Sequence, residues 1–195
     1  MERCDYNKAL MLHEMWLRGD EGGKKIGSMD LHPPEHGFPI VDLSGRNLRC
    51  SSLSRAELYH IKMGRADFTR AFLRRVRMMR SDLVRAKLDG ADLRNSELDE
   101  CDLTEASLVN TCLECADMRS AKLWGADLRY ANLRRSNLSN ANLLFADLRD
   151  TDLRGAKLDG ALIRKDAIKW AFVDKTALRK AVLIECSKET QKKEA

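Results

Sequence analysis

The chain has 195 residues, enough for one domain, and carries 33% charged residues, only 6% aromatic residues and a formal net charge of +5. This charge is too modest to single out nucleic acid as the partner. No apolar run approaches the roughly 20 residues of a membrane-spanning helix, and the first twenty residues lack the basic start and unbroken apolar stretch of a signal peptide. We therefore expect a cytoplasmic protein with no membrane partner.

Residues 6–18 have the pattern of an amphipathic helix. Asp5 is suited to the N-cap and Gly19 to the stop. The apolar stripe at helical spacing comprises Tyr6, Ala9, Leu10, His13, Trp16 and Leu17. We expect this helix to cap whatever follows it, and a helix that docks a partner is the alternative.

Residues 21–40 contain Gly and Pro without a regular pattern, and we interpret them as a connector between the helix and the rest of the chain. The run from His32 to His36 has the H-x-x-E-H spelling of some metalloproteases. That motif works only on a helix, and Pro33 and Pro34 exclude a helical interior. We expect a rigid turn here and no metal site.

From residue 41 onward the chain repeats every five residues. Of the 29 third places from Leu43 to Leu183, all are apolar and 22 are Leu. Of the 29 first places from Val41 to Ala181, 24 are Ala, Ser, Thr or Cys. A straight helix would spread a five-residue repeat around its cylinder, and a straight strand would flip it at each step. Only a chain that turns a corner every five residues keeps first and third places inside, with the corner at places four and five.

This pattern resembles the pentapeptide-repeat proteins, whose repeat is A-[DN]-L-x-x, over roughly residues 41–183. The resemblance implies an all-β fold, a right-handed quadrilateral β-helix with four units per coil and about seven coils. We expect residues 1–40 to form the N-terminal helix and connector that cap this β-helix, residues 41–184 the array, and residues 185–195 a polar tail. For residues 164–184 two readings stay open, because Asp166 could cap a C-terminal helix or the β-helix could continue.

Six cysteines fit a reducing compartment. Cys101 and Cys186 occupy first places and are expected to be small inward fillers, while Cys50, Cys112 and Cys115 occupy outward or corner places. The C-x-x-C spacing of Cys112 and Cys115 has no second pair for zinc. We expect ordinary reduced thiols.

Residues twenty apart should stack in this fold, which predicts columns of side chains on the outside. One side collects basic residues, with Asp92, Glu114 and Asp152 as its acids. An ordinary solvated face is one reading, and a surface that holds an acidic protein or phosphates is the other. The candidate partner-binding residues are Arg55, Arg74, Arg75, Arg94, Arg134, Arg135 and Arg154.

A second column is apolar and suggests either packing against a tail or an interface. Its candidate residues are Val84, Trp124 and Leu144, with Phe145 adjacent. Charge is also layered along the chain: residues 62–87 contain nine basic and two acidic residues, and residues 89–117 contain one basic and nine acidic.

No catalytic constellation, cofactor motif or metal-ligand set emerges, and we expect a protein that is not an enzyme. The leading hypothesis is a non-enzymatic scaffold that presents flat charged faces to a macromolecule, most simply a protein with an acidic surface. The family resemblance implies a second hypothesis, a DNA mimic that binds gyrase, which the net basic charge disfavours. Direct nucleic-acid binding is the third, and an end-to-end dimer stays open.

Overall fold

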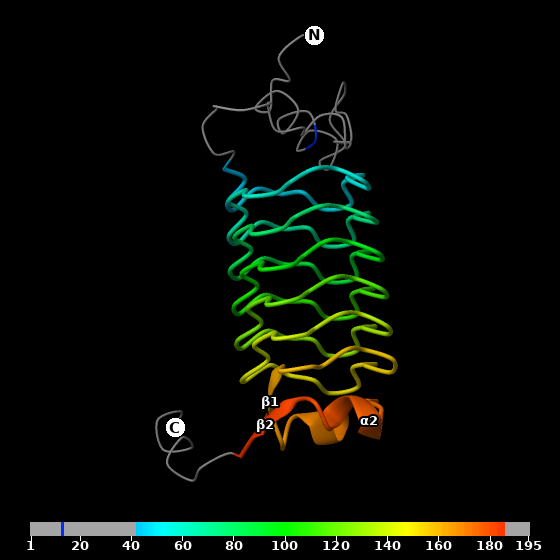
Figure 1. Ribbon diagram of the computed structural model, residues 1–195. Helices are drawn as coiled ribbons and strands as arrows, with labels where there is room; N and C mark the ends of the chain where they lie inside the picture. Colours follow the sequence, from blue (N-terminus) through cyan, green and yellow to red (C-terminus); the bar gives the residue numbers. More distant parts are fainter. Residues whose placement is uncertain (1–12, 14–41, 186–195) are drawn as a thin grey trace, which may run out of the picture.

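The computed structural model describes His13 and residues 42–185. From Asp42 onward the chain winds into a stack of coils (Figure 1). Parallel bridges join residues twenty apart, from Asp42 with Lys62 down to Asn142 with Leu162. Each coil therefore consists of four five-residue units. Apart from His13, which is helical and buried, the predicted helix, the connector with its H-x-x-E-H run, Cys4, Cys186 and the tail after Glu185 lie outside the described residues.

The centre of the stack is a solid apolar core. Every third-place residue from Leu43 to Ile163 is buried, and so is every first-place residue from Ser51 to Ala161. Arg46 is exposed, because it occupies a first place in the first described coil. The inward assignment of first and third places is therefore confirmed over these coils.

The corners have a left-handed backbone at every fifth place from Gly45 to Gly160. Nineteen non-glycine residues and five glycines fill these positions, with φ between 54° and 73°. The first-place N–H of the next unit donates to the third-place carbonyl, as from Arg46 to Leu43 at 3.1 Å. A hydrogen bond of this kind around a residue with positive φ is the pattern of a type II turn.

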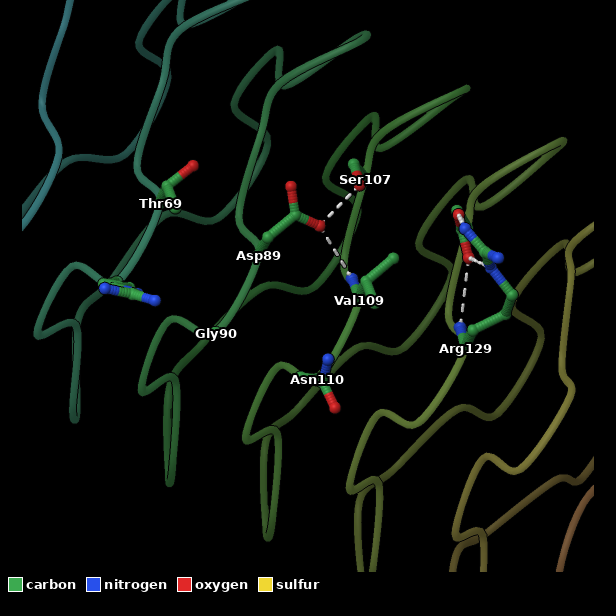
Figure 2. A pocket seen from close by; sticks show the side chains of 9 residues that line it. Thr69, Asp89, Gly90, Ser107, Val109, Asn110 and Arg129 are labelled. Carbon is green, nitrogen blue, oxygen red and sulfur yellow. Dashed lines mark hydrogen bonds and ion pairs between the residues drawn. The ribbon is translucent and has the colours of Figure 1, made fainter.

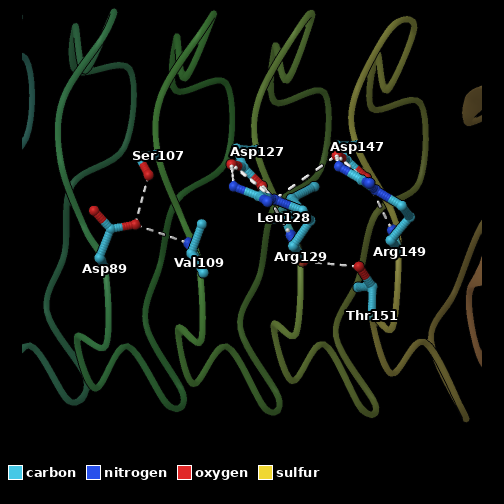
Figure 3. Close-up of polar contacts among 9 residues, drawn as sticks. All are labelled: Asp89, Ser107, Val109, Asp127, Leu128, Arg129, Asp147, Arg149 and Thr151. Atoms are coloured by element: carbon cyan, nitrogen blue, oxygen red, sulfur yellow. Dashed lines mark hydrogen bonds and ion pairs between the residues drawn. The ribbon is translucent and has the colours of Figure 1, made fainter.

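Second places favour Asp and Asn because these side chains accept a hydrogen bond from the backbone N–H two residues later. All thirteen Asp and Asn residues at second places from Asp42 to Asp152 accept a hydrogen bond from the fourth-place N–H of their own unit. Figure 3 shows this bond for Asp127 and Asp147. Such a side chain supplies the acceptor that the turn's backbone lacks.

Several polar side chains at first places donate hydrogen bonds to the coil above. Ser81, Thr111 and Thr151 each donate a hydroxyl hydrogen bond to the carbonyl 23 residues earlier, at 2.8 Å. The Cys101 thiol lies 2.7 Å from the Met78 carbonyl, and burial raises its pKa to about 12. Cys101 is thus an inert inward filler, as predicted.

The last described coil keeps the register but changes the local structure. Strand β1 (Leu162–Arg164) pairs in parallel with β2 (Val182–Ile184), twenty residues later. Between them a 3-10 helix, η2 (Ile168–Trp170), and a short helix, α2 (Lys175–Leu178), replace two regular units at the lower end of Figure 1. The structure therefore combines the two readings of this segment.

Asp166 does not cap a helix in this coil. Its carboxylate instead accepts from the Arg164 guanidinium, and this hydrogen bond lowers the Asp166 pKa. The residue that precedes α2 is Asp174, whose carboxylate accepts the Gly155 N–H at 2.7 Å. Over residues 42–185, no helix is long and apolar enough to cross a membrane.

Candidate interaction surfaces

The predicted arginine column forms one side wall of the stack. We call this wall the arginine face; it consists of units 51–55, 71–75, 91–95, 111–115, 131–135 and 151–155. Backbone hydrogen bonds fix its rows: the Arg55 N–H donates to the Arg74 carbonyl at 2.9 Å, and the Arg75 N–H donates to the Arg94 carbonyl at 3.0 Å. The Arg135 N–H donates likewise to Arg154 at 3.1 Å. The seven predicted arginines therefore share one wall with three acids.

Three of these arginines are held by carboxylates of the same wall. The Arg94 guanidinium donates two hydrogen bonds to Asp92, at 2.7 and 2.6 Å, and Arg154 binds Asp152 in the same way, at 2.9 and 2.6 Å. Arg134 approaches Asp152 at 3.6 Å. Hydrogen bonds from Arg94 and Arg154 lower the pKa of Asp92 and Asp152, respectively.

The other four arginines, Arg55, Arg74, Arg75 and Arg135, form no ion pair within residues 42–185. Three of them lie together in the upper half of the wall, where units 51–55 and 71–75 contain no acid. The arginine face therefore divides into arginines paired with acids of their own wall and arginines without an ion pair among residues 42–185.

The layered charge seen in the sequence is used between coils. Arg77 lies between Glu57 and Glu97, with 3.1 Å to each. We use the name ion-pair ladder for Arg77, Arg80 and Arg85 with the glutamates twenty residues later, Glu97, Glu100 and Glu105. The hydrogen bonds that these glutamates accept raise the pKa of all three arginines. Three of the nine acids in the acidic layer are thus paired with the basic layer above it.

The predicted apolar column lies on the opposite wall, two units further along each coil, which we call the aromatic face (units 81–85, 101–105, 121–125, 141–145 and 161–165). The rings of Trp124 and Phe145 are 5.4 Å apart between centroids, and the Arg164 guanidinium lies 5.2 Å from the centre of the Phe145 ring. Trp124 remains 41% exposed, whereas Val84, Leu144 and Phe145 are half-buried. The contacts of Phe145 with Trp124 and Arg164 therefore cover part of the apolar surface of the aromatic face.

A shallow hollow of about 420 Å³ lies on a third wall, around Asp89 (Figure 2). Asp89 accepts hydrogen bonds from the Ser107 hydroxyl and, at 3.0 Å, from the Val109 N–H. It thereby supplies the acceptor that Ser107, at a second place, cannot provide. Arg129, at the hollow's edge, donates to Asp127. Asp89, Asp127 and Arg129 therefore stabilise turns of the fold.

Other chemistry is not assembled in the part of the chain that is described. Residues 42–185 and His13 include no group of three or more His, Cys, Asp or Glu side chains that could hold a metal ion. Cys112 and Cys115 are free thiols on the arginine face, half-buried and exposed, respectively.

Known proteins share this five-residue repeat. The family model "Pentapeptide repeats (8 copies)" matches residues 81–119, 116–155 and 126–164. A pentapeptide repeat protein from Nostoc PCC 7120, alr5209, is 35% identical over 54% of this chain and 84% of its own, with a TM-score of 0.47. The chain belongs to the pentapeptide-repeat family. Its fold is accordingly the right-handed β-helix of that family.

Two further solved structures match this pentapeptide-repeat protein. Rfr23 from the cyanobacterium Cyanothece 51142 is 31% identical over 55% of the chain, with a TM-score of 0.44, and the chain spans 64% of the length of Rfr23. QnrB1, a plasmid-mediated fluoroquinolone resistance protein, is 12% identical over 78% of this chain and 94% of its own, with a TM-score of 0.39. Comparison with curated protein sequences gives no match.

The pairing of the arginines is the feature that sequence reasoning missed. The sequence does contain a pattern that indicates this pairing. Wherever one unit has Asp at its second place and Arg at its fourth, the two side chains form an ion pair, which we call a fork, as in Asp92–Arg94 and Asp152–Arg154. The same fork recurs on two other walls, at Asp117–Arg119, Asp127–Arg129 and Asp147–Arg149.

Proposed function

We propose that this pentapeptide-repeat protein is a non-enzymatic interaction module that docks an acidic surface of a partner protein on its arginine face. The observation that carries this proposal is the charge balance of the wall, with seven arginines against three acids and four arginines without an ion pair. Guanidinium groups match carboxylates in two-point hydrogen bonding, and a rigid wall presents them without a large ordering cost.

A DNA mimic that binds a topoisomerase is a weaker candidate. Mimicry needs a continuous anionic surface, and six of the nine carboxylates in the acidic layer of residues 89–117 are paired with basic side chains. Its paired acids are Asp92, Glu97, Glu100, Asp102, Glu105 and Asp117. Direct nucleic-acid binding is disfavoured by Glu114, which interrupts the arginine column. Phosphate contacts would also give a steep loss of affinity with salt.

Two further features belong to the same proposal. We propose that residues 1–40 cap the first of about seven quadrilateral coils, that residues 41–184 form the array, and that residues 185–195 are a tail. We also propose a second docking surface on the aromatic face, because Trp124 exposes 41% of its area beside the half-buried Leu144 and Phe145. The protein is expected to act in the cytoplasm without a cofactor.

The proposal is tested by two variants of equal charge. The first replaces the four unpaired arginines of the arginine face, Arg55, Arg74, Arg75 and Arg135, with Gln. The control replaces four ion-paired arginines of other walls, Arg80, Arg85, Arg119 and Arg129, with Gln. Proteins captured from cell extract on the immobilised chain are compared by quantitative mass spectrometry. We expect the first variant to lose acidic proteins that the control retains, and equal retention by both would contradict the proposal.

A further inference from the structure

The upper half of the arginine face concentrates positive charge at one point. We call Arg55, Arg74 and Arg75 the arginine cluster. The Arg55 N–H donates to the Arg74 carbonyl at 2.9 Å, so the three residues are neighbours on two adjacent coils. The other polar side chains of these two units are Ser51, Ser52 and Ser54, and none of them is charged.

The carboxylates around the arginine cluster are already engaged. Glu57, the next acid along the chain, lies 3.1 Å from Arg77. Asp92, in the coil below, accepts two hydrogen bonds from Arg94, which lower its pKa; Arg74 contributes only a smaller, longer-range share of that lowering. Among residues 42–185, the arginine cluster therefore lacks a counter-charge of its own.

Two residues of the cluster occupy corners that disfavour arginine. Arg55 has φ 64° and Arg75 has φ 57°, a left-handed conformation that costs an ordinary L-residue about 1–2 kcal/mol. At the corners of the ion-pair ladder, Arg80 and Arg85 offset this cost through Glu100 and Glu105. Arg55 and Arg75 have no such compensation within the described residues.

The small extent of the cluster decides what kind of anion fits. Below it, Arg94 is held by Asp92, and Glu114 follows in the same column. The available charge thus spans two coils, which is about 5 Å along the axis at β-strand spacing. A nucleic-acid backbone needs a longer cationic track. A single group with two negative charges and several acceptor oxygens matches three guanidinium groups on neighbouring rows.

We propose that the arginine cluster binds the phosphate group of a phosphorylated serine or threonine in a partner protein. This inference rests on the proposed function, because it names the anion that the partner presents at one part of the arginine face. Recognition of phosphorylated segments by clustered arginines uses the same two-point hydrogen bonds that Arg94 makes with Asp92.

The test is an NMR titration of the full chain, which follows the Nε–H signals of its arginines. The probes are a ten-residue Gly-Ser peptide with two phosphoserines, the same peptide without phosphate, and the same peptide with Glu at both positions. The phosphorylated probe should shift the signals of Arg55, Arg74 and Arg75 saturably and bind more tightly than the other two.

Two triple variants give the control. Arg55→Gln, Arg74→Gln and Arg75→Gln together should weaken binding of the phosphorylated peptide by about tenfold or more, since charge-assisted hydrogen bonds are lost. Arg65→Gln, Arg80→Gln and Arg85→Gln remove equal charge from corners at other positions around the stack and should leave the affinity within about twofold, because exposed charges are screened. Equal weakening of peptide binding in both triple variants would overturn the proposed site. So would Nε–H signals of Arg55, Arg74 and Arg75 that the phosphorylated peptide does not shift.

Other outcomes separate the two proposals. If the Glu peptide binds the cluster as tightly as the phosphorylated one, the phosphate assignment fails while docking of acidic proteins stands. If the phosphorylated peptide binds but capture of acidic proteins does not depend on the arginine face, the proposed function fails and the phosphate site stands. Tighter, strongly salt-dependent binding of a thymidine 15-mer at these arginines overturns the phosphoprotein assignment in favour of nucleic acid.

Discussion

The ion-pair ladder and the arginine cluster use the same residue on the same kind of backbone for different ends. Arg80 and Arg85 in the ladder and Arg75 in the cluster have φ between 56° and 57°. Both ladder corners bind a glutamate of the next coil, at 3.0 and 2.6 Å, whereas the residue below Arg75 is Asn95. The residue twenty positions later therefore decides whether a corner arginine forms an ion pair that stabilises the stack or remains without one.

The largest expected effect tests the core on which both regions depend. Leu93 is fully buried beneath the arginine face. Leu93→Ala should lower the free energy of unfolding by about 2–5 kcal/mol, since stacked coils cannot collapse around the void. Leu183→Ala, in the last described coil where the side chain is only half-buried, should cost less than half as much. Denaturant unfolding measures both, and equal costs would show that the core is not continuous as described.

A smaller effect of opposite sign is expected at the corners. Arg75→Gly should raise the free energy of unfolding by about 0.5–1 kcal/mol, because glycine adopts positive φ without strain but loses more chain entropy. The same replacement at Arg85 should gain less, since it also removes the 2.6 Å ion pair with Glu105. Thermal melts of the two variants test this prediction. A larger increase in stability for Arg85→Gly than for Arg75→Gly would show that the Arg85 ion pair does not stabilise the stack.

The smallest expected effect converts a paired arginine into an available one. Asp92→Asn keeps an oxygen acceptor for the Arg94 N–H, as Asn132 does for Arg134, but removes the charge that holds the Arg94 guanidinium. Binding of the phosphoserine peptide should tighten by about two- to fivefold, as an added charge-assisted contact allows. Unchanged or weaker binding would mean that Arg94 is already available in the native protein.

The same variant carries a pH signature. The Arg94 hydrogen bond lowers the Asp92 pKa in the folded state, so its stabilising contribution is complete above the unfolded value of about 3.9 and is lost as pH falls through the folded pKa. Asp92→Asn should therefore flatten the acid side of the melting-temperature profile, below about pH 4. An identical acid limb in both proteins would remove Asp92 from this role.

Much of the fold could be predicted because the repeat is a steric requirement. Leu at third places and small residues at first places determine the inside, and the twenty-residue register then predicts the columns, including Arg77 above Glu97. Left-handed corners were less visible, since arginine fills seven of them where glycine or asparagine would have signalled the conformation. The residue type at these corners therefore reflects a requirement for charge and not the conformational preference of the backbone.

The candidate site was only half predictable for the same reason. Sequence placed the seven arginines on one wall, but whether Arg94 turns to Asp92 or toward solvent depends on side-chain geometry within one unit. The short helices of the last coil were also hard to foresee. There the second places become Leu162, Ala167, Phe172, Ala177 and Val182, whose side chains cannot accept the fourth-place N–H.

Ion pairing divides the arginines into a set that stabilises the stack and a set that remains available to a partner. Chemical labelling of each arginine tests this division. Phenylglyoxal modification of the native full chain, followed by mass spectrometry, gives a rate for each arginine. Arg55, Arg74 and Arg75 should react fastest and be protected by the phosphoserine peptide, while Arg80, Arg85, Arg94 and Arg154 should react slowly with or without it. Equal rates across both sets, or protection confined to the paired arginines, would contradict the account.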